Sequence, residues 1–358
     1  MLKMKGCIIA GPGKMAVSSD CPLPETIVDT GALIKPLIWS PCTSDAHLCE
    51  TGAATMPYLV GKAVGHEMCG EIIQIGSKVK DFKVGDRVIV DATMPIWRSL
   101  NTQLGLPDTD SVYGGYDDPE RGGSFVEKYY IRDADMNLAR IPDGVTLEQA
   151  VMVPDMMSTA FTGVQNLDIR FGETVLVIGI GPVGLMGVRG SVLSEAGRVF
   201  AVGSRKVCVD LAKEYGATQV FDYHDPDYLK RILEANVGKP VDKVLLAGGG
   251  EGEIDKGLSV LRAGGTLVNL DAFFSGKPIV IQPASFGFGF GEKTIKGVGC
   301  KGGRVWLERL VTLIQTGRVN PEKLVTHRFH GGVDAIPQGM DLFLNRDRTM
   351  IKPVIYND

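Results

Sequence analysis

The stretch that decides the fold is Thr174-Val175-Leu176-Val177-Ile178-Gly179-Ile180-Gly181-Pro182-Val183-Gly184. Its first half is a run of β-branched and aliphatic residues, which is typical of a strand buried on both faces. Its glycines at 179, 181 and 184 allow a tight turn, close approach of the backbone to a pyrophosphate, and close packing of the following helix. The N–H groups at the start of that helix would face the phosphates. The stretch therefore predicts the first strand and turn of a dinucleotide-binding fold.

The residues that follow support this interpretation. The glycine spacing alone would also fit an ordinary strand, turn and helix with no nucleotide. However, a helical period runs from Gly184 to Leu193, and Arg198 to Val202 has the pattern of a second strand. Strands are then expected at 220–221, 241–247 and 266–270, and helices at 228–235 and 254–261. This alternation predicts a parallel, doubly wound sheet.

Length, composition and charge limit the class of protein. A chain of 358 residues is long enough for about two domains, and 44% hydrophobic with 22% charged residues is ordinary for a globular protein. A formal net charge of −4 gives no reason to expect nucleic acid or an anionic membrane as a partner. No apolar run of about 18 residues occurs, so we expect a cytoplasmic protein. Seven cysteines, an odd number spread through a large chain, argue against a disulfide framework.

The N-terminal part, to about residue 150, is rich in short strands, glycine and proline. Strands are expected at 6–10, 32–39, 71–75, 87–90 and 125–131. The strand at 32–39 is expected at a sheet edge, because Pro36 cannot donate a hydrogen bond to a neighbour. The irregular segment 94–123 is typical of a functional lid or an assembly arm. After Gly299 we expect one more helix, at 304–316, and a final strand at 352–356.

Residues with metal-binding chemistry lie outside the predicted nucleotide fold. His66 and Glu67 stand side by side before a strand, an arrangement that suits a zinc ligand with a neighbouring carboxylate. This pair alone would carry little weight. Cys42 follows another strand, and Asp155 is a carboxylate in apolar surroundings, which would need a partner if buried. Cys42, His66 and Asp155 make three ligands of zinc-compatible type and leave a fourth position open, as in a catalytic site.

The motifs around these residues resemble a known family. The fifteen residues 65–79 are similar to the signature of zinc-containing medium-chain alcohol dehydrogenases, and the resemblance covers essentially the whole chain. The motifs at 41–47, 133–139, 154–157, 179–186 and 201–205 resemble the microbial NADP-dependent secondary alcohol (isopropanol) dehydrogenases. The resemblance implies zinc ligands at Cys42, His66 and Asp155, which Glu67 can join. The four-cysteine lobe that holds a structural zinc in other relatives is missing, so one catalytic zinc per subunit is implied.

The resemblance also implies the domain organisation. Residues 1–157 and 299–358 would form a β-rich, GroES-like catalytic domain that binds zinc. Residues 158–298 would form an inserted Rossmann domain that binds NADP, with the active site in the cleft. Family members are usually homotetramers, and we expect the same here.

Zinc-assisted hydride transfer needs a proton route. The Lewis acid polarises a ketone oxygen or lowers the pKa of an alcohol. Ser44 is the expected first proton acceptor, and His47 the outer end of the relay, because imidazole titrates near neutrality. The alternative is that Ser44 and His47 are only turn and cap residues.

The residues after the second predicted strand favour NADP(H). NAD-specific folds carry an acidic residue there, whereas this chain has Gly203, then Ser204 and Arg205, which can bind a 2′-phosphate. Tyr223 resembles a family residue of the same subsite. The full set of expected cofactor contacts is Gly179, Ile180, Gly181, Pro182, Val183, Gly184, Gly203, Ser204, Arg205, Tyr223, Leu270, Asp271, Ala272 and Arg346.

The expected substrate pocket departs from the narrower group. Its residues would be Thr93, Tyr116, Ala272, Gly299 and Cys300. Close relatives carry tyrosine at the position of Ala272 and a larger aliphatic residue at that of Thr93, so this pocket would be larger. Cys300 could equally be a small buried hydrophobic residue.

Three hypotheses follow. The leading one is a zinc-dependent NADP(H) oxidoreductase for secondary alcohols and ketones, of the isopropanol and acetone type with room for bulkier ketones. The second is a zinc-dependent polyol or amino-alcohol dehydrogenase of the same superfamily. The third is a non-catalytic NADPH-binding protein, against which the intact zinc ligands argue.

Overall fold

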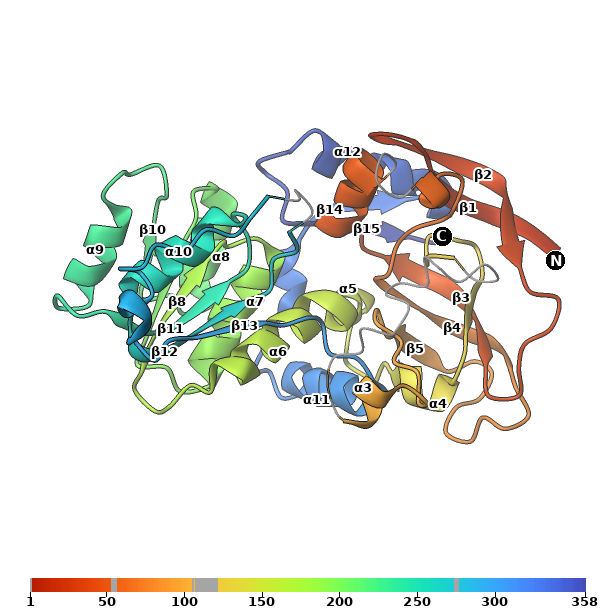
Figure 1. Cartoon of the computed structure of the whole chain (residues 1–358). Coiled ribbons are helices and arrows are strands. Elements are labelled where there is room, and N and C mark those ends of the chain that lie inside the picture. Colours follow the sequence, from red (N-terminus) through yellow and green to blue (C-terminus); the bar gives the residue numbers. More distant parts are fainter. Residues whose placement is uncertain (1, 53–56, 105, 107–121, 274–276) are drawn as a thin grey trace. The chain divides into compact units, whose positions relative to one another are not determined.

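The computed structural model describes residues 2–52, 57–104, 106, 122–273 and 277–358, and it divides the chain into two compact units (Figure 1). Unit 1 comprises Met1–Ser158 and Cys300–Asp358. Unit 2 comprises Thr159–Gly299. Tyr116 lies outside the described residues.

Unit 2 is built on a six-stranded parallel sheet with the strand order β10-β9-β8-β11-β12-β13. The strands are β8 (Thr174–Ile178), β9 (Arg198–Val202), β10 (Gln219–Phe221), β11 (Val241–Leu246), β12 (Leu261–Asn269) and β13 (Thr294–Gly297). The helices are α6 (Ser158–Leu167), α7 (Pro182–Leu193), α8 (Lys206–Glu214), α9 (Tyr228–Ala235) and α10 (Gly252–Val260), with a short turn η5 (Gly287–Gly289). In chain order the strands run 3-2-1-4-5-6. Because crossovers between parallel strands are right-handed, the two halves of this order place their helices on opposite faces. The predicted doubly wound sheet is confirmed.

The opening stretch forms the centre of unit 2. Every residue of β8 is buried, as its apolar run predicts. Gly179 has a left-handed backbone, with φ of 87°, and a Cβ added to Gly184 would lie 1.7 Å from the carbonyl oxygen of Gly179. Glycine at these two positions therefore lets α7 begin directly against the turn after β8.

Unit 1 contains a larger sheet with the order β14-β15-β3-β4-β5-β7, and β6 pairs with β3. Its strands are β3 (Ala32–Trp39), β4 (Met68–Ile75), β5 (Arg87–Val90), β6 (Tyr129–Ile131), β7 (Leu138–Arg140), β14 (Val325–His330) and β15 (Lys352–Tyr356), and β1 (Leu2–Gly11) pairs with β2 (Lys14–Leu23). The helices and turns are α1 (Thr43–His47), η1 (Leu48–Gly52), η2 (Pro57–Leu59), α3 (Leu100–Gln103), α4 (Ala134–Asn137), α5 (Leu147–Val151), η4 (Val153–Met157), α11 (Arg304–Gln315), η6 (Pro321–Leu324), η7 (Gly332–Ala335) and α12 (Ile336–Leu344). The core of this unit joins side chains from both of its sequence segments.

The prediction that β3 lies at a sheet edge is wrong. β4 pairs along one side of β3, while β6 and β15 share the other side. Pro36 lies in the interval between the residues paired with β6 and those paired with β15, and the register shifts between Pro36 and Ile38. The missing N–H therefore leaves no broken ladder bond, and the Pro36 carbonyl accepts a hydrogen bond from Asn357 Nδ2 at 2.7 Å.

Two further expectations need correction. Of the strand expected at 125–131, only β6 forms a strand in the sheet. Val126 makes only an isolated bridge to Gly6. The chain after Gly299 has a second helix, α12, in addition to α11. Within the part of the chain that the structure describes, no helix combines the length and apolarity needed to cross a membrane. All seven cysteines lie among the described residues, and none of them forms a disulfide.

Candidate functional site

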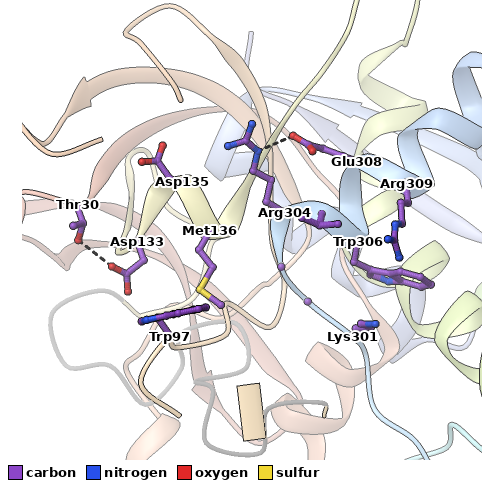
Figure 2. Close-up of a pocket in the computed structure, with 13 residues that line it drawn as sticks. Thr30, Trp97, Asp133, Asp135, Met136, Lys301, Arg304, Trp306, Glu308 and Arg309 are labelled. Carbon is purple, nitrogen blue, oxygen red and sulfur yellow. Dashed lines mark hydrogen bonds and ion pairs between the residues drawn. The ribbon is translucent and has the colours of Figure 1, made fainter. Parts of the chain in front are cut away.

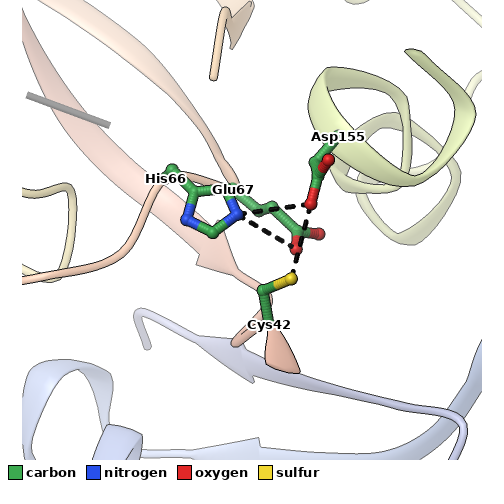
Figure 3. Close-up of side chains that lie close together, drawn as sticks. All are labelled: Cys42, His66, Glu67 and Asp155. Carbon is green, nitrogen blue, oxygen red and sulfur yellow. Dashed lines mark hydrogen bonds and ion pairs between the residues drawn. The ribbon is translucent and has the colours of Figure 1, made fainter. Parts of the chain in front are cut away.

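Four predicted zinc-site residues come together in unit 1 (Figure 3). Cys42 lies at the N-terminus of α1, His66 and Glu67 immediately precede β4, and Asp155 lies in the π-helical turn η4. One ligand atom from each lies within 4.8 Å of the others. His66, Glu67 and Asp155 are buried, and Cys42 is half-buried.

The distances in this cluster are those of groups converging on one point. Asp155 Oδ2 lies 3.4 Å from Cys42 Sγ and 3.3 Å from His66 Nε2. His66 Nε2 lies 3.8 Å from Glu67 Oε1. Thiolate, imidazole and carboxylate are the donor types that zinc binds, and two buried carboxylates beside a thiol need a nearby cation. The residues present therefore fit a zinc ion.

Asp45 contacts two of these predicted ligands, and the sequence interpretation missed it. Its Oδ1 lies 3.3 Å from His66 Nδ1, and its Oδ2 accepts a hydrogen bond from the Cys42 N–H at 2.9 Å. Asp45 is fully buried. A carboxylate on Nδ1 leaves Nε2 directed at the metal position. The only sign of this contact in the sequence is that the 41–47 motif contains an aspartate.

Lys352 was also missed, and it determines the electrostatic surroundings of Glu67. Its ammonium, 1% exposed, donates to Glu67 Oε1 and to the Pro41 carbonyl, each at 2.7 Å. Glu67 Oε2 is buried and has no hydrogen-bond partner among the described residues. Burial raises the pKa of Glu67 to about 7, and the charge of Lys352 opposes this rise. Burial also raises the pKa of the Cys42 thiol, with a further contribution from Asp155.

Ser44 and His47 both lie on α1, directly after Cys42. The hydroxyl oxygen of Ser44 is buried and makes no hydrogen bond within the described residues. His47, in the last turn of α1, is exposed. A buried hydroxyl without a partner is one that a bound molecule can satisfy.

The predicted phosphate-binding residues lie at the carboxyl ends of neighbouring strands in unit 2. Gly203, Ser204 and Arg205 follow β9, and Tyr223 follows β10. Gly203 N–H donates to the Phe221 carbonyl at 2.9 Å, which holds these two strand ends side by side. No acidic residue lies in the first turn of α8, and the buried Ser204 hydroxyl has no partner in the described chain. A vacant donor beside the N-terminus of α8 and Arg205 fits an anionic group.

The other expected cofactor residues are divided between the units. Leu270, Asp271 and Ala272 follow β12 at the carboxyl end of the same sheet, and Asp271 Oδ2 accepts a hydrogen bond from Gly250 N–H at 2.9 Å. Arg346 belongs to unit 1, where it follows α12 with φ of 53°. Its contact with a cofactor remains a prediction.

The residues expected around the substrate are also divided. Thr93 and Cys300 lie buried in unit 1, whereas Ala272 and Gly299 belong to unit 2. A cavity of about 830 Å³ in unit 1 lies elsewhere (Figure 2). Its described lining includes Trp97, Met136, Arg304 and Trp306 but neither a predicted zinc ligand nor a predicted substrate residue.

Comparison with known proteins finds matches to segments of both units. The sequence model of the alcohol dehydrogenase GroES-like domain family matches residues 29–143, and that of the zinc-binding dehydrogenase family matches residues 182–316. The NADP-dependent isopropanol dehydrogenase of Thermoanaerobacter brockii is 42% identical over 355 residues, 98% of this chain and 99% of the relative. That of Clostridium beijerinckii is 40% identical over the same shares.

A solved structure of the alcohol dehydrogenase TADH from Thermus sp. ATN1 has the same fold. It superimposes with a TM-score of 0.88 and covers 99% of this chain and 100% of its own, at 22% sequence identity. Together with the near full-length identity to the isopropanol dehydrogenases, these matches show that the chain belongs to the zinc-containing medium-chain alcohol dehydrogenase family.

Proposed function

We propose that this protein is a zinc-dependent oxidoreductase that transfers hydride between NADP(H) and a secondary alcohol or ketone. The observation that carries the proposal is the convergence of Cys42, His66 and Asp155 in unit 1. In unit 2 of the same chain, Gly203-Ser204-Arg205 directly follows β9. The full-length similarity to NADP-dependent isopropanol dehydrogenases supports the same substrate class.

The residues of unit 1 hold the metal and its surroundings. When bound, zinc supplies a Lewis acid that polarises the substrate oxygen. Cys42, His66 and Asp155 would hold it, and Asp45 keeps His66 in the orientation that presents Nε2. The ion pair with Lys352 holds Glu67 Oε1 and leaves Oε2 available. This arrangement supports three permanent ligands, with Glu67 as an occasional fourth.

The proton route uses α1. Ser44 Oγ, which is buried and without a partner in the described chain, would exchange the substrate proton. His47, exposed on the last turn of the same helix, would pass that proton to water. General acid and base groups of this kind contribute about 10²–10⁴-fold to a rate.

The residues of unit 2 would select the cofactor. The backbone turn 179–184 would take the pyrophosphate at the N-terminus of α7. Ser204 and Arg205 would bind the 2′-phosphate, and Tyr223, half exposed, would lie along the adenosine. Ala272 and Gly299 would complete the substrate pocket with Thr93 and Cys300. Because Thr93 and Ala272 are small, we propose that ketones larger than acetone are accepted.

Assembly and location complete the proposal. We propose a homotetramer in the cytoplasm that needs no nucleic acid or membrane partner. Size-exclusion chromatography with light scattering tests the tetramer.

A substrate panel tests the function. The purified protein is assayed with NADPH or NADH against acetone, cyclohexanone, acetophenone and a polyol-derived ketose. We expect turnover of simple ketones with strong preference for NADPH. Turnover of the ketose alone would favour a polyol dehydrogenase, and zinc-loaded protein that binds NADPH without reducing any carbonyl would support a non-catalytic role.

A further inference from the structure

Asp91 is a buried carboxylate that the proposed mechanism does not use. It directly follows β5 and is 1% exposed. Its Oδ1 accepts hydrogen bonds from the N–H of Thr93 at 2.9 Å and from the Thr93 hydroxyl at 3.0 Å. Its Oδ2 accepts a hydrogen bond from the N–H of Gly303. Asp91 therefore joins the segment after β5 to the segment before α11, which lies more than 200 residues away in the sequence.

The two joined segments are in direct contact. A Cβ added to Gly302 would lie 1.9 Å from Thr93 Oγ1 and 2.6 Å from Asp91 Oδ2. It would also lie 2.8 Å from Pro95 Cδ. Only glycine fits at 302 while Thr93 keeps its hydroxyl on Asp91. The orientation of the Thr93 side chain and the path of residues 300–303 are thus set together.

The segment 300–303 is also attached to the turn that carries Asp155. Cys300 Sγ donates to the Pro154 carbonyl at 3.4 Å, one residue before Asp155. Ser158 donates to the Lys301 carbonyl and accepts a hydrogen bond from Trp306 Nε1 at 2.8 Å. On the other side, Val90 of β5 pairs with Met68, the residue after Glu67. Asp91 therefore connects the β4–β5 side of the zinc cluster with its η4 side.

Burying a carboxylate is costly, and no cationic partner of Asp91 appears among the described residues. Burial raises the pKa of Asp91, and the hydrogen bonds from Gly303 and Thr93 counter this rise. A carboxylate can accept several hydrogen bonds in fixed directions, which an apolar side chain cannot do. This property suits a residue whose role is to fix positions.

We propose that Asp91 is a positioning residue that holds Thr93 and Cys300–Gly303 at a fixed separation and thereby limits the size of the ketone that the zinc site accepts. The inference rests on the proposed function, in which Thr93 and Cys300 line the substrate pocket. Asp91 acts through these two walls and touches neither metal nor substrate.

Two conservative variants separate the links. Asp91→Asn keeps the shape but has a single acceptor oxygen, so it cannot satisfy Thr93 and Gly303 together. Thr93→Val keeps the shape and removes the hydroxyl donor. Glu148→Gln is the matched control, because Glu148 is another buried carboxylate of unit 1, bound to Arg328 and Tyr356.

The measured quantity is the ratio of kcat/KM for cyclohexanone to that for acetone, with NADPH and zinc-loaded protein. We expect Asp91→Asn and Thr93→Val each to raise the ratio by about threefold or more, mainly through KM, since small changes in pocket fit alter discrimination by about tenfold or more. Glu148→Gln should keep the parental ratio. Hydrogen exchange of a peptide spanning 299–306 should accelerate in Asp91→Asn, with unchanged zinc content.

The outcomes are separable. A parent protein that reduces neither ketone contradicts the proposed function. An active parent whose ratio changes by less than about threefold in both variants overturns the positioning role. A shift as large in Glu148→Gln also overturns it, because the effect would then be general loosening. If Asp91→Asn does not fold, hydrogen exchange of the 299–306 peptide in Thr93→Val decides: faster exchange supports the positioning role, and an unchanged rate overturns it.

Discussion

His66 is held between two carboxylates. Its Nδ1 lies 3.3 Å from Asp45 Oδ1, and its Nε2 lies 3.3 Å from Asp155 Oδ2. The two carboxylates differ in their other contacts. Asp45 also accepts the Cys42 N–H, so its carboxylate is engaged with the scaffold, whereas Asp155 Oδ2 faces the shared centre of the cluster. We therefore predict that Asp155 is the ligand and that Asp45 orients the imidazole.

This difference gives the first prediction. Asp155→Ala should reduce bound zinc from about one per chain to a small fraction and abolish turnover, because it removes one of three permanent ligands. Asp45→Asn should still bind zinc, with affinity lowered about 10–100-fold, as for other residues that orient a ligand. Elemental analysis and competition with a chelating dye measure both.

Asp334→Ala is the control, because that exposed carboxylate pairs only with Lys5 in the contacts described for it. It should keep full zinc content. Retention of stoichiometric zinc by Asp155→Ala would show that the ligand assignment is wrong.

Residue types and motifs pointed to Cys42, His66, Glu67 and Asp155, which the structure brings together, but not to the residues that contact them. Lys352 stands in an apolar final strand, and its partner Glu67 is 285 residues away. Asp91 and Gly303 are likewise remote in the sequence. A long-range hydrogen bond leaves no local pattern, so a buried lysine or aspartate is indistinguishable from a surface residue until the chain is folded. The proton relay of Ser44 and His47 remains a prediction.

At the scale of elements, the adjacent ends of β9 and β10 form the predicted phosphate site. Gly203 leaves no side chain at the end of β9, and Ile180 occupies the nearest space. A Cβ at 203 would lie 2.2 Å from Ile180 Cγ1, so any substitution there displaces that side chain. The charge effect of an aspartate must therefore be separated from the steric effect.

Gly203→Asp combined with Arg205→Ala should lower the preference for NADPH over NADH by about 100-fold or more. Two hydrogen bonds to a charged phosphate, at about 1.5–3 kcal/mol each, would be lost, and the new carboxylate would repel the phosphate. The ratio of kcat/KM for the two cofactors measures this. Gly203→Ala should weaken both cofactors similarly. If Gly203→Ala alone erased the preference, sterics rather than charge would explain it.

A second set of elements, α5, β14 and β15, is joined by Glu148. Arg328 donates to its two carboxylate oxygens at 2.7 and 2.6 Å, and the Tyr356 hydroxyl donates to it as well. Burial alone would raise the pKa of Glu148. The hydrogen bonds from Arg328 and Tyr356 outweigh burial and hold the pKa below its ordinary value of 4.5.

Glu148→Gln should therefore destabilise unit 1 in a pH-dependent way. Because the pKa of Glu148 is lower in the folded state than in the unfolded state, the ionised carboxylate stabilises the fold at pH values above the unfolded pKa. This contribution declines as the pH falls below about 4.5 and is lost once the pH is below the folded pKa. We expect the free energy of unfolding to fall by about 1–2 kcal/mol at pH 7. The smaller value is favoured because the Arg328 side chain is 47% exposed. The difference from the parent should shrink below the ordinary pKa.

Tryptophan fluorescence during urea unfolding measures this loss in unit 1, because all three tryptophans, at 39, 97 and 306, lie there. Glu308→Gln is the control, since Glu308 pairs with Arg304 on α11 and its side chain is 45% exposed. It should change stability by about 0.5 kcal/mol or less. Equal effects of the two variants would contradict the role of the Glu148 pair.

The elements that could be predicted are those with a strong local period. β8 and β9 are apolar runs after their first residues, Thr174 and Arg198, and the bounds expected for β9 are confirmed. α12 escaped prediction because it carries Pro337 at its start and Gly339 within it, both of which weaken a helical pattern. β13 was missed because all four of its residues are exposed. The position of β3 depends on how β6 and β15 divide one side of it, which no local pattern records.

At the scale of the whole molecule, each unit has its own core and its own predicted ligand. Unit 1 contains the cluster of Cys42, His66, Glu67 and Asp155, whereas the core strands β8 and β9 of unit 2 lead into the segments 179–184 and 203–205. Ligands that bind only the folded state stabilise the part that binds them. Removing each ligand should therefore loosen a different part of the chain.

Hydrogen exchange followed by mass spectrometry tests this division. Removal of zinc by a chelator should accelerate exchange in 42–47, 66–67 and 153–157, because Lys352 alone would then be left to offset the charge of the two buried carboxylates. NADPH at about 100 times its Kd contributes about 2.7 kcal/mol to the folded state, and should slow exchange at 179–184 and 203–205. Slower exchange around Arg346 would support its predicted cofactor contact.

NADH at the same concentration should protect 203–205 much less, because it lacks the phosphate that Ser204 and Arg205 would bind. Equal protection of 203–205 by the two cofactors would place the 2′-phosphate elsewhere, and chelation that loosened only unit 2 would contradict the zinc site in unit 1.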